Sequence, residues 1–184
     1  MIPGLIILGV LVIVVLWFVV AYNSLVRLRN EVRNAWSQID VQLKRRHDLI
    51  PNLVEVVKDY MAYEQEVLEN VTKARATAMQ ARTPGEAARA EAGLTRALAG
   101  LYAVMENYPD LKANQNVSQL QEELASTENK IAFARQYYND TVMRYNTRTE
   151  TIPTNIVAGI GGFHKEEFFE APEEEKEVPK VDLR

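Results

Sequence analysis

The chain has 184 residues, a net charge of −4 and 47% hydrophobic residues, which allows one ordinary domain with appendages. It has no cysteine, so disulfides, thiolate metal sites and a cysteine nucleophile are excluded. The charge is uneven, because arginines and lysines gather early while glutamates crowd the stretch from Glu166 to Glu177. The middle of the chain is rich in Ala, Glu, Gln, Leu, Lys and Arg, a composition typical of long helices.

An uncharged apolar run extends from Leu5 to Tyr22. As a helix it would measure about 27 Å, close to the thickness of a bilayer's hydrocarbon core. Trp17 and Tyr22 lie near its end, where aromatic rings favour the headgroup layer. We therefore expect residues 1–24 to be a transmembrane anchor in contact with the lipid bilayer, with lipid-facing side chains Leu5, Leu8, Val12, Leu16, Trp17 and Tyr22.

Two other interpretations of this run compete with an anchor. A buried core helix rarely lies at the extreme N-terminus without a polar face. A cleaved signal peptide is the stronger alternative, because Val19 and Ala21 fit the small-residue rule for cleavage. No Lys or Arg precedes the run, however, and the run is long for a signal.

The flanking charges predict the orientation. Arg27, Arg29 and Arg33 follow the run, and positive charge is retained on the cytoplasmic side. We therefore expect a single-pass protein of the cell (inner) membrane, with a short N-terminus outside and the domain in the cytoplasm. The same three arginines can meet anionic lipid headgroups.

From Leu25 onward, apolar residues recur at spacings of three and four, as in a coiled coil. This pattern predicts a helix that ends near Asp48, because the residue before Pro51 is disfavoured in the α region. Pro51 then suits the first turn of a second helix, which continues to about Ala78.

A third helix is predicted to start at Thr83-Pro84-Gly85-Glu86, where Thr83 can cap and Glu86 can complete a capping box. It should end before an irregular stretch from Asn107 to Val117. Ser118 and Gln121 predict a second capping box and a fourth helix that stops before Ile152–Pro153.

Together these elements predict an all-α protein. Its N-terminal transmembrane helix continues into an elongated antiparallel up-and-down bundle of four long helices over 25–150. An irregular, partly disordered acidic tail is expected over 151–184, with the glycine-rich segment Thr154–Phe163 not helical and Gly159–Gly162 a flexible joint. Phe163, Phe168 and Phe169 are the exception in this tail, and we expect them to dock on the bundle or on a neighbouring copy.

The chain shows no catalytic signature. Neither His47 nor His164 has a carboxylate three residues before it, so the Glu-x-x-His pattern of di-iron bundles is missing. HExxH, P-loop and GxSxG motifs are also missing. We predict no catalytic residue, no metal and no cofactor.

The cluster from Lys44 to Asp48 is the densest basic segment. It is either a solvated, salt-bridged helix end or a contact with another subunit, since nucleic acid suits neither its length nor its acidic neighbours and lipid lies too far along the helix. We expect Trp36 to pack in the core. The tyrosines of the fourth helix either pack in the core or mark an interface. The candidate self-assembly interface comprises Lys44, Arg45, Arg46, Asp48, Glu166, Glu167, Phe168, Phe169, Tyr138 and Tyr145.

Three blocks of the sequence resemble the LemA family. They are YNSLVRLRNEVRNAWSQIDVQLKRRHDLIPNLVEVV (Tyr22–Val57), ENYPDLKANQNVSQLQEELASTENKIAFARQYYNDTVMRYN (Glu106–Asn146) and IPTNIVAGIGGF (Ile152–Phe163) with its following FFEA. The resemblance implies an N-terminal transmembrane helix, long antiparallel helices and placement on the cytoplasmic side. It brings no catalytic residues.

These observations predict a non-enzymatic, membrane-anchored homo-oligomer that assembles as a ring or filament and scaffolds membrane or membrane-protein organisation. The alternative is a monomeric adaptor or regulator of a membrane-embedded partner, such as a protease or sensor. No nucleic-acid partner is expected.

Overall fold

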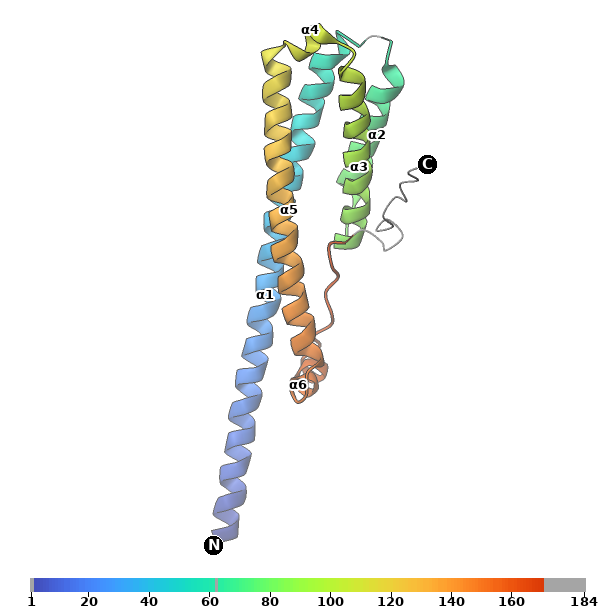
Figure 1. The fold of residues 1–184 in the computed structure, drawn as a ribbon. Helices are drawn as coiled ribbons and strands as arrows, with labels where there is room; N and C mark the ends of the chain where they lie inside the picture. The colour runs from blue at the N-terminus through green and yellow to red at the C-terminus, as the bar shows by residue number, and fades with distance from the viewer. Residues whose placement is uncertain (1, 62, 171–184) are drawn as a thin grey trace, which may run out of the picture. The chain divides into compact units, whose positions relative to one another are not determined.

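The computed structural model describes residues 2–61 and 63–170, which form helices joined by short turns with no β-strand among them (Figure 1). The prediction of an all-α fold is confirmed. In chain order the helices are α1 (Ile2–Lys58), α2 (Gln65–Gln80), α3 (Pro84–Met105), α4 (Pro109–Lys112), α5 (Gln115–Glu150) and α6 (Thr154–Gly161).

The described residues divide into two compact units, one from 2–38 and 136–166, the other from 39–135 and 167–170. The first unit buries Leu25, Val32 and Ala35 of α1 together with Tyr138 and Val142 of α5. The second has a core of aliphatic side chains from α1, α2, α3, α4 and α5. Its fully buried members are Leu53, Val57, Met61, Val71, Leu94, Leu101 and Leu111. The spacing of three and four therefore identified the inward faces correctly.

The expected helix break at Ile50–Pro51 is wrong, because α1 continues through Pro51 to Lys58. A proline inside a helix has no N–H for the carbonyl four residues earlier, which here belongs to His47. The side chain of Arg75 on α2 supplies the missing donor, since its Nε lies 2.6 Å from the His47 carbonyl oxygen. Contact with another helix thus compensates for the proline, which no local rule can anticipate.

The start of α3 agrees with the sequence. Thr83 adopts an extended backbone, its hydroxyl accepts from the Glu86 N–H, and Pro84 occupies the first turn. The Glu86 carboxylate accepts a hydrogen bond from the N–H of Arg82, the residue before the cap. The backbone hydrogen bond from Arg82 lowers the pKa of Glu86 below its usual value, and the one from Thr83 lowers it by a smaller amount.

The fourth predicted helix begins earlier than expected. Within the stretch predicted to be irregular, α4 forms one short turn, and α5 starts at Gln115 rather than at Ser118. The side-chain oxygen of Asn114 accepts from the N–H groups of Asn116 and Val117, so Asn114 is the capping residue. At its other end α5 stops at Glu150, before Ile152–Pro153 as predicted.

The segment expected to be irregular after Thr154 instead forms α6. Gly162 follows this helix with φ of 65°, and the N–H of Phe163 bonds to the carbonyl of Ala158, which is a Schellman ending. The glycines therefore terminate a helix rather than form a flexible joint. Val157 and Ala158 are buried, so packing of one face stabilises α6 despite its glycine content.

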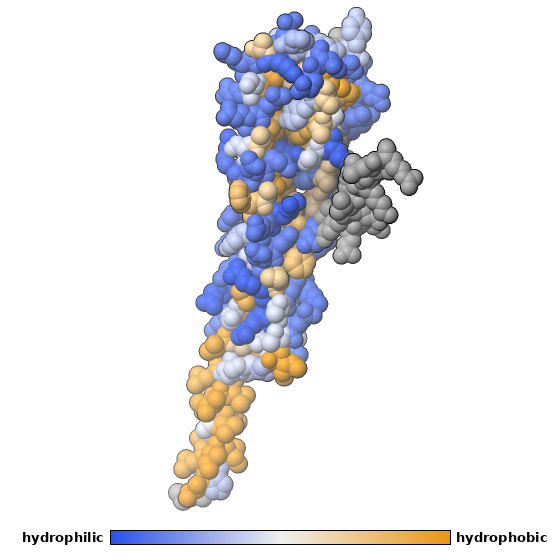
Figure 2. Space-filling model, viewed as in Figure 1, coloured by the Kyte–Doolittle hydropathy of each residue, from blue (hydrophilic) through white to orange (hydrophobic). Residues whose placement is uncertain are grey.

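The N-terminal part of α1 is long and apolar enough to cross a membrane. Only 6% of its most apolar window is buried, which argues against a core helix of a soluble protein. Figure 2 shows its apolar side chains exposed on the surface. α1 is thus a candidate membrane span that continues into the domain as the same helix.

The Pro51–Arg75 relation gives a first testable prediction. Arg75→Met should lower the free energy of unfolding by roughly 1–3 kcal/mol, because the His47 carbonyl loses its donor. In a Pro51→Ala background the backbone N–H returns, and the same substitution should cost clearly less. Urea unfolding of the full-length wild type, the two single variants and the double variant in mild detergent, followed by circular dichroism, measures the difference. Equal losses in both backgrounds would contradict this account.

Candidate functional site

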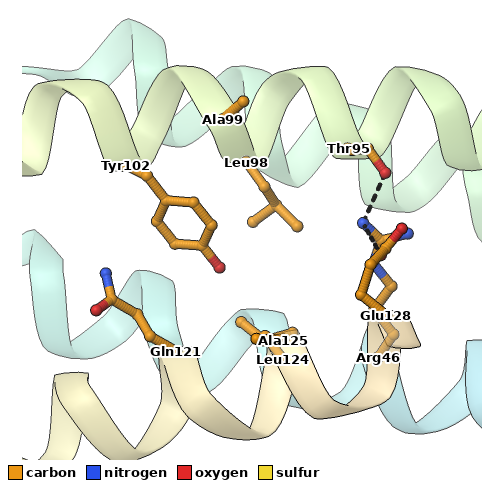
Figure 3. Close-up of a pocket in the computed structure, with 9 residues that line it drawn as sticks. All are labelled: Arg46, Thr95, Leu98, Ala99, Tyr102, Gln121, Leu124, Ala125 and Glu128. Atoms are coloured by element: carbon orange, nitrogen blue, oxygen red, sulfur yellow. Dashed lines mark hydrogen bonds and ion pairs between the residues drawn. The ribbon is translucent and has the colours of Figure 1, made fainter. Parts of the chain in front are cut away.

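A cluster of charged side chains, of which Arg46 and Glu91 are buried, joins three helices of the second unit, and Figure 3 shows Arg46 and Glu128 of this cluster. Arg46 of α1 is only 4% exposed, and its Nη1 lies 2.8 Å from Oε2 of Glu91 on α3. Its Nη2 lies 2.9 Å from Oε2 of Glu128 on α5 and donates to the Thr95 hydroxyl at 2.8 Å. The planar fork of the guanidinium allows one side chain to reach all three partners.

His47 extends this cluster toward α2. Its Nε2 lies 2.6 Å from Oε1 of Glu91. Glu91 is already the carboxylate partner of Arg46, so we assign the hydrogen to His47 Nε2, which donates. Because the His47 carbonyl accepts from Arg75, this one residue links α1 to both α2 and α3.

The described contacts make this cluster a structural clamp. Each of its charged groups is paired within the chain, and a buried pair of this kind costs stability when one partner is removed. Among the described residues, no group of three or more His, Cys, Asp or Glu side chains is placed to hold a metal ion.

A groove of about 440 Å³ opens beside the clamp, between α3 and α5 (Figure 3). Burial raises the pKa of the Tyr102 phenol in this groove, while the nearby Arg46 guanidinium acts in the opposite direction. Tyr102 is therefore a neutral hydroxyl at physiological pH. The groove is lined by Arg46, Thr95, Leu98, Ala99, Tyr102, Gln121, Leu124, Ala125 and Glu128.

The basic segment proposed as an assembly surface is split by the fold. Lys44, Arg45 and Asp48 are exposed, and among the described residues Arg45 makes only a long ion pair with Glu123, at 3.6 Å. Arg46 is buried in the clamp and is not available to a neighbouring copy, so its assignment to an exposed receptor needs correction. Consecutive residues of a helix lie about 100° apart, so Arg46 and His47 face the interior while Lys44, Arg45 and Asp48 face outward.

The start of the acidic tail packs on its own chain. The side-chain amide of Asn146 accepts from the Glu166 N–H and donates to the Glu166 carbonyl, both at 2.9 Å. Phe163 and Phe169 are buried, as expected of docked phenylalanines, while Phe168 is about one-third exposed and Glu167 lies against Gly85. The expected disorder and the glutamates beyond Glu170 lie outside the described residues.

Two aromatic residues of α5 belong to the core. Tyr138 and Tyr145 are both buried, and the ring of Tyr138 lies 5.5 Å from that of Trp36. Burial raises the pKa of Tyr145, and the nearby Glu166 carboxylate raises it further. Two members of the candidate interface are therefore interior residues in this structure.

The side chains predicted to contact the membrane are all exposed except for one of the three arginines. Leu5, Leu8, Val12, Leu16, Trp17 and Tyr22 all expose their side chains. Arg27 and Arg33 are exposed, whereas Arg29 is half-buried with its guanidinium 4.9 Å from the centre of the Phe163 ring. Phe163 also meets Tyr22 edge-on, at 5.4 Å between ring centres.

Sequence reasoning missed Glu91, which anchors the clamp. A signal was present, because Glu91 falls on the same helical stripe as Leu94, Leu98 and Leu101. A carboxylate on an apolar stripe requires a buried cation, and Arg46 is likewise aligned with Ile39, Leu43 and Ile50 on α1.

The clamp gives a second prediction. Glu91→Gln should lower the free energy of unfolding by about 3–5 kcal/mol, because it leaves Arg46 buried with one charged partner fewer. Glu128→Gln is the matched control, since Glu128 is 48% exposed and its loss should cost less than about 1 kcal/mol. Urea unfolding of the full-length chain in mild detergent measures both values, and equal losses would refute the assignment.

Comparison with known proteins identifies relatives over most of the chain. The sequence model of the LemA family matches residues 35–183. Protein LemA of Metamycoplasma hominis is 28% identical over 88% of this chain and 75% of its own length. Magnetosome protein MamQ 1 of Paramagnetospirillum magneticum is 25% identical over 81% of this chain.

Magnetosome protein MamQ of Magnetospirillum gryphiswaldense is 23% identical over 80% of this chain. The match spans 64% of the length of each of these two magnetosome proteins. The family match covers well over half of the chain and includes the buried clamp as well as the start of the tail. On that basis, the protein belongs to the LemA family.

Proposed function

We propose that this protein is a non-enzymatic membrane scaffold that assembles with copies of itself and organises a patch of membrane or a membrane protein. The observation that carries the proposal is that α1 contains both the candidate span and core residues of the helical domain. Because one unbroken helix serves both the domain and its anchor, contacts that the domain makes with a neighbouring molecule also position the span in the membrane.

The membrane is the bacterial inner membrane, with the short N-terminus outside and the domain in the cytoplasm. Arg27 and Arg33 support this orientation, because they follow the span and remain exposed. The pairing of charges within the clamp supports a non-enzymatic role, since Arg46 and Glu91 already bind each other.

Exposed side chains of the second unit support assembly. Phe133 on α5 is 75% exposed, and Val41 on α1 is also exposed. Phenylalanine is among the aromatic residues enriched at protein interfaces. Lys44 and Arg45 are exposed in the same unit and can receive the glutamates of a neighbouring copy's tail.

The mass of the full-length protein in mild detergent tests the proposal. A scaffold should form a discrete assembly larger than one copy, measured by light scattering with the detergent contribution subtracted. A particle of one copy at every concentration tested would refute self-assembly and favour the adaptor.

Substitution of the exposed apolar residues gives a third prediction. Val41→Ser with Phe133→Ser should shift the particle toward one copy, because the apolar surface available for contact is removed. Asn129→Ser with Lys130→Ser is the control on exposed polar positions of α5. Unchanged helicity in both variants shows that the fold is intact, and an unchanged mass in the first would show that Val41 and Phe133 do not mediate assembly.

Charge reversal gives a fourth prediction. Lys44→Glu with Arg45→Glu should weaken assembly, and added salt should weaken wild-type assembly in the same direction. Arg46 must stay unchanged, since its reversal would break the clamp rather than test an interface. If the assembly is insensitive to both changes, the acidic tail is not its ligand.

The alternative is a monomeric adaptor of a membrane-embedded partner, and one feature favours it. A groove of about 780 Å³ lies between the C-terminal end of α1 and the start of α2. Val54, Met61 and Leu68 line it together with charged side chains, a mixture of apolar and polar groups that protein interfaces also show. An adaptor should recover a defined partner from native membranes at comparable stoichiometry.

A further inference from the structure

α6 carries an apolar face that nothing in the described chain covers. Ile156 and Ile160 lie four residues apart and share one side of the helix, and Ile152 lies two residues before its first residue. Their side chains are 79% (Ile152), 59% (Ile156) and 72% (Ile160) exposed. No charged residue occurs between Glu150 and His164. Apolar exposure of this density, without charge, marks a contact surface.

The position of α6 identifies what the surface meets. Gly161 ends the helix against α1, because a side chain there would meet the Phe163 ring at 2.5 Å and the Tyr22 ring at 3.2 Å. Tyr22 is the last residue of the apolar run. Figure 2 shows apolar side chains gathered beside the span, at the end of the domain where Figure 1 places α6. The exposed isoleucines therefore lie beside the C-terminal end of the candidate span.

A pair of arginines lies at the same level. Arg27 of α1 and Arg148 of α5 line one hollow with Val20, Asn23 and Ser24, in the same unit as α6. Both arginines are exposed, and neither makes an ion pair with a carboxylate of the described residues. Arg148 lies in the last turn of α5, where the negative end of the helix dipole stabilises its positive charge. Arg27 does not lie at a helix end and has no such stabilisation. Two cations around one hollow favour an anion between them.

We propose that α6 is a membrane foot: its isoleucine face enters the interfacial layer of the bilayer that α1 spans, while Arg27 and Arg148 hold the phosphate of an anionic lipid. The proposal rests on the membrane anchoring proposed above but not on self-assembly. It adds a second membrane contact, made by a segment far from the span in the sequence.

The chemistry of the surface favours lipid over a protein partner. Short helices with one apolar face lie in the plane of the interface, with nearby basic side chains on the headgroups. Trp17 and Tyr22 mark this layer on α1, and Phe163 continues the aromatic group. A second copy would have to cover the isoleucines at the height where headgroups already surround the span.

Fluorescence quenching in vesicles tests the foot. Since the chain has no cysteine, Ile156→Cys in the full-length protein gives a single site for an environment-sensitive label. The protein is inserted into vesicles of phosphatidylcholine and phosphatidylglycerol, then exposed to nitroxide-labelled lipids or to aqueous iodide. We expect quenching by the nitroxide lipids and protection from iodide. Gln136→Cys, exposed on α5, is the control and should show the reverse.

The outcomes are distinct. An Ile156 label quenched by iodide as strongly as the Gln136 label would overturn the proposal. A label protected from both quenchers would overturn it too, because another protein would then cover α6. Val14→Cys inside the span separates this result from failure of the anchor, since its label should be quenched by nitroxide lipids whether or not α6 docks.

Two variants of the labelled chain test the contributing groups. Ile152→Ser with Ile160→Ser should abolish lipid quenching at Ile156 in every vesicle. Arg148→Gln should lower the ratio of docked to undocked α6 roughly fivefold in anionic vesicles, which corresponds to about 1 kcal/mol for one basic side chain at such a surface. It should have no effect in phosphatidylcholine alone, and Arg135→Gln should have no effect in either. Equal effects of Arg148→Gln in both vesicles would overturn the headgroup assignment.

Discussion

One helix has to satisfy two environments, and the rest of the structure follows from that constraint. Over the candidate span α1 is apolar on all sides and exposed, whereas from Ala21 onward it buries one stripe that includes Leu25, Val32 and Ala35. The change takes place within about one turn, and the backbone stays helical throughout. No helix end is therefore left with unpaired backbone groups at the membrane boundary, where they would be costly.

The same continuity is maintained at the weakest point of α1. Pro51 removes a backbone donor, and the turn that precedes it carries Arg46 and His47. Side chains from α2, α3 and α5 bind this turn: Arg75 bonds the free carbonyl, while Glu91 and Glu128 bind the guanidinium. Polar contacts thus hold the helix where its own hydrogen bonds fail. Such contacts demand one arrangement of the four helices, whereas apolar packing alone tolerates several.

The parts of the fold that follow from periodicity were predictable, and the parts that depend on distant partners were not. The stripes of α1, α3 and α5 and the cap at Thr83 are local patterns, and each was recovered. The course of α1 through Pro51 depends on Arg75. The burial of Arg46 depends on the carboxylates of Glu91 and Glu128, which lie far from it in the sequence. A proline and a run of cations look like a helix end only when such partners are unknown.

The glycine-rich segment misled sequence reasoning for a related reason. Glycine lowers helix propensity, but Gly162 ends α6 in a left-handed conformation and Gly161 lets the helix approach Tyr22. What these residues determine is the position of a short helix against the span. A single span leaves a protein free to tilt in the membrane and to turn about the axis of its own helix, whereas a second contact through the membrane foot would fix both. Copies held at one tilt lose less orientational freedom when they associate, so the foot would favour assembly without contributing to the contact between copies.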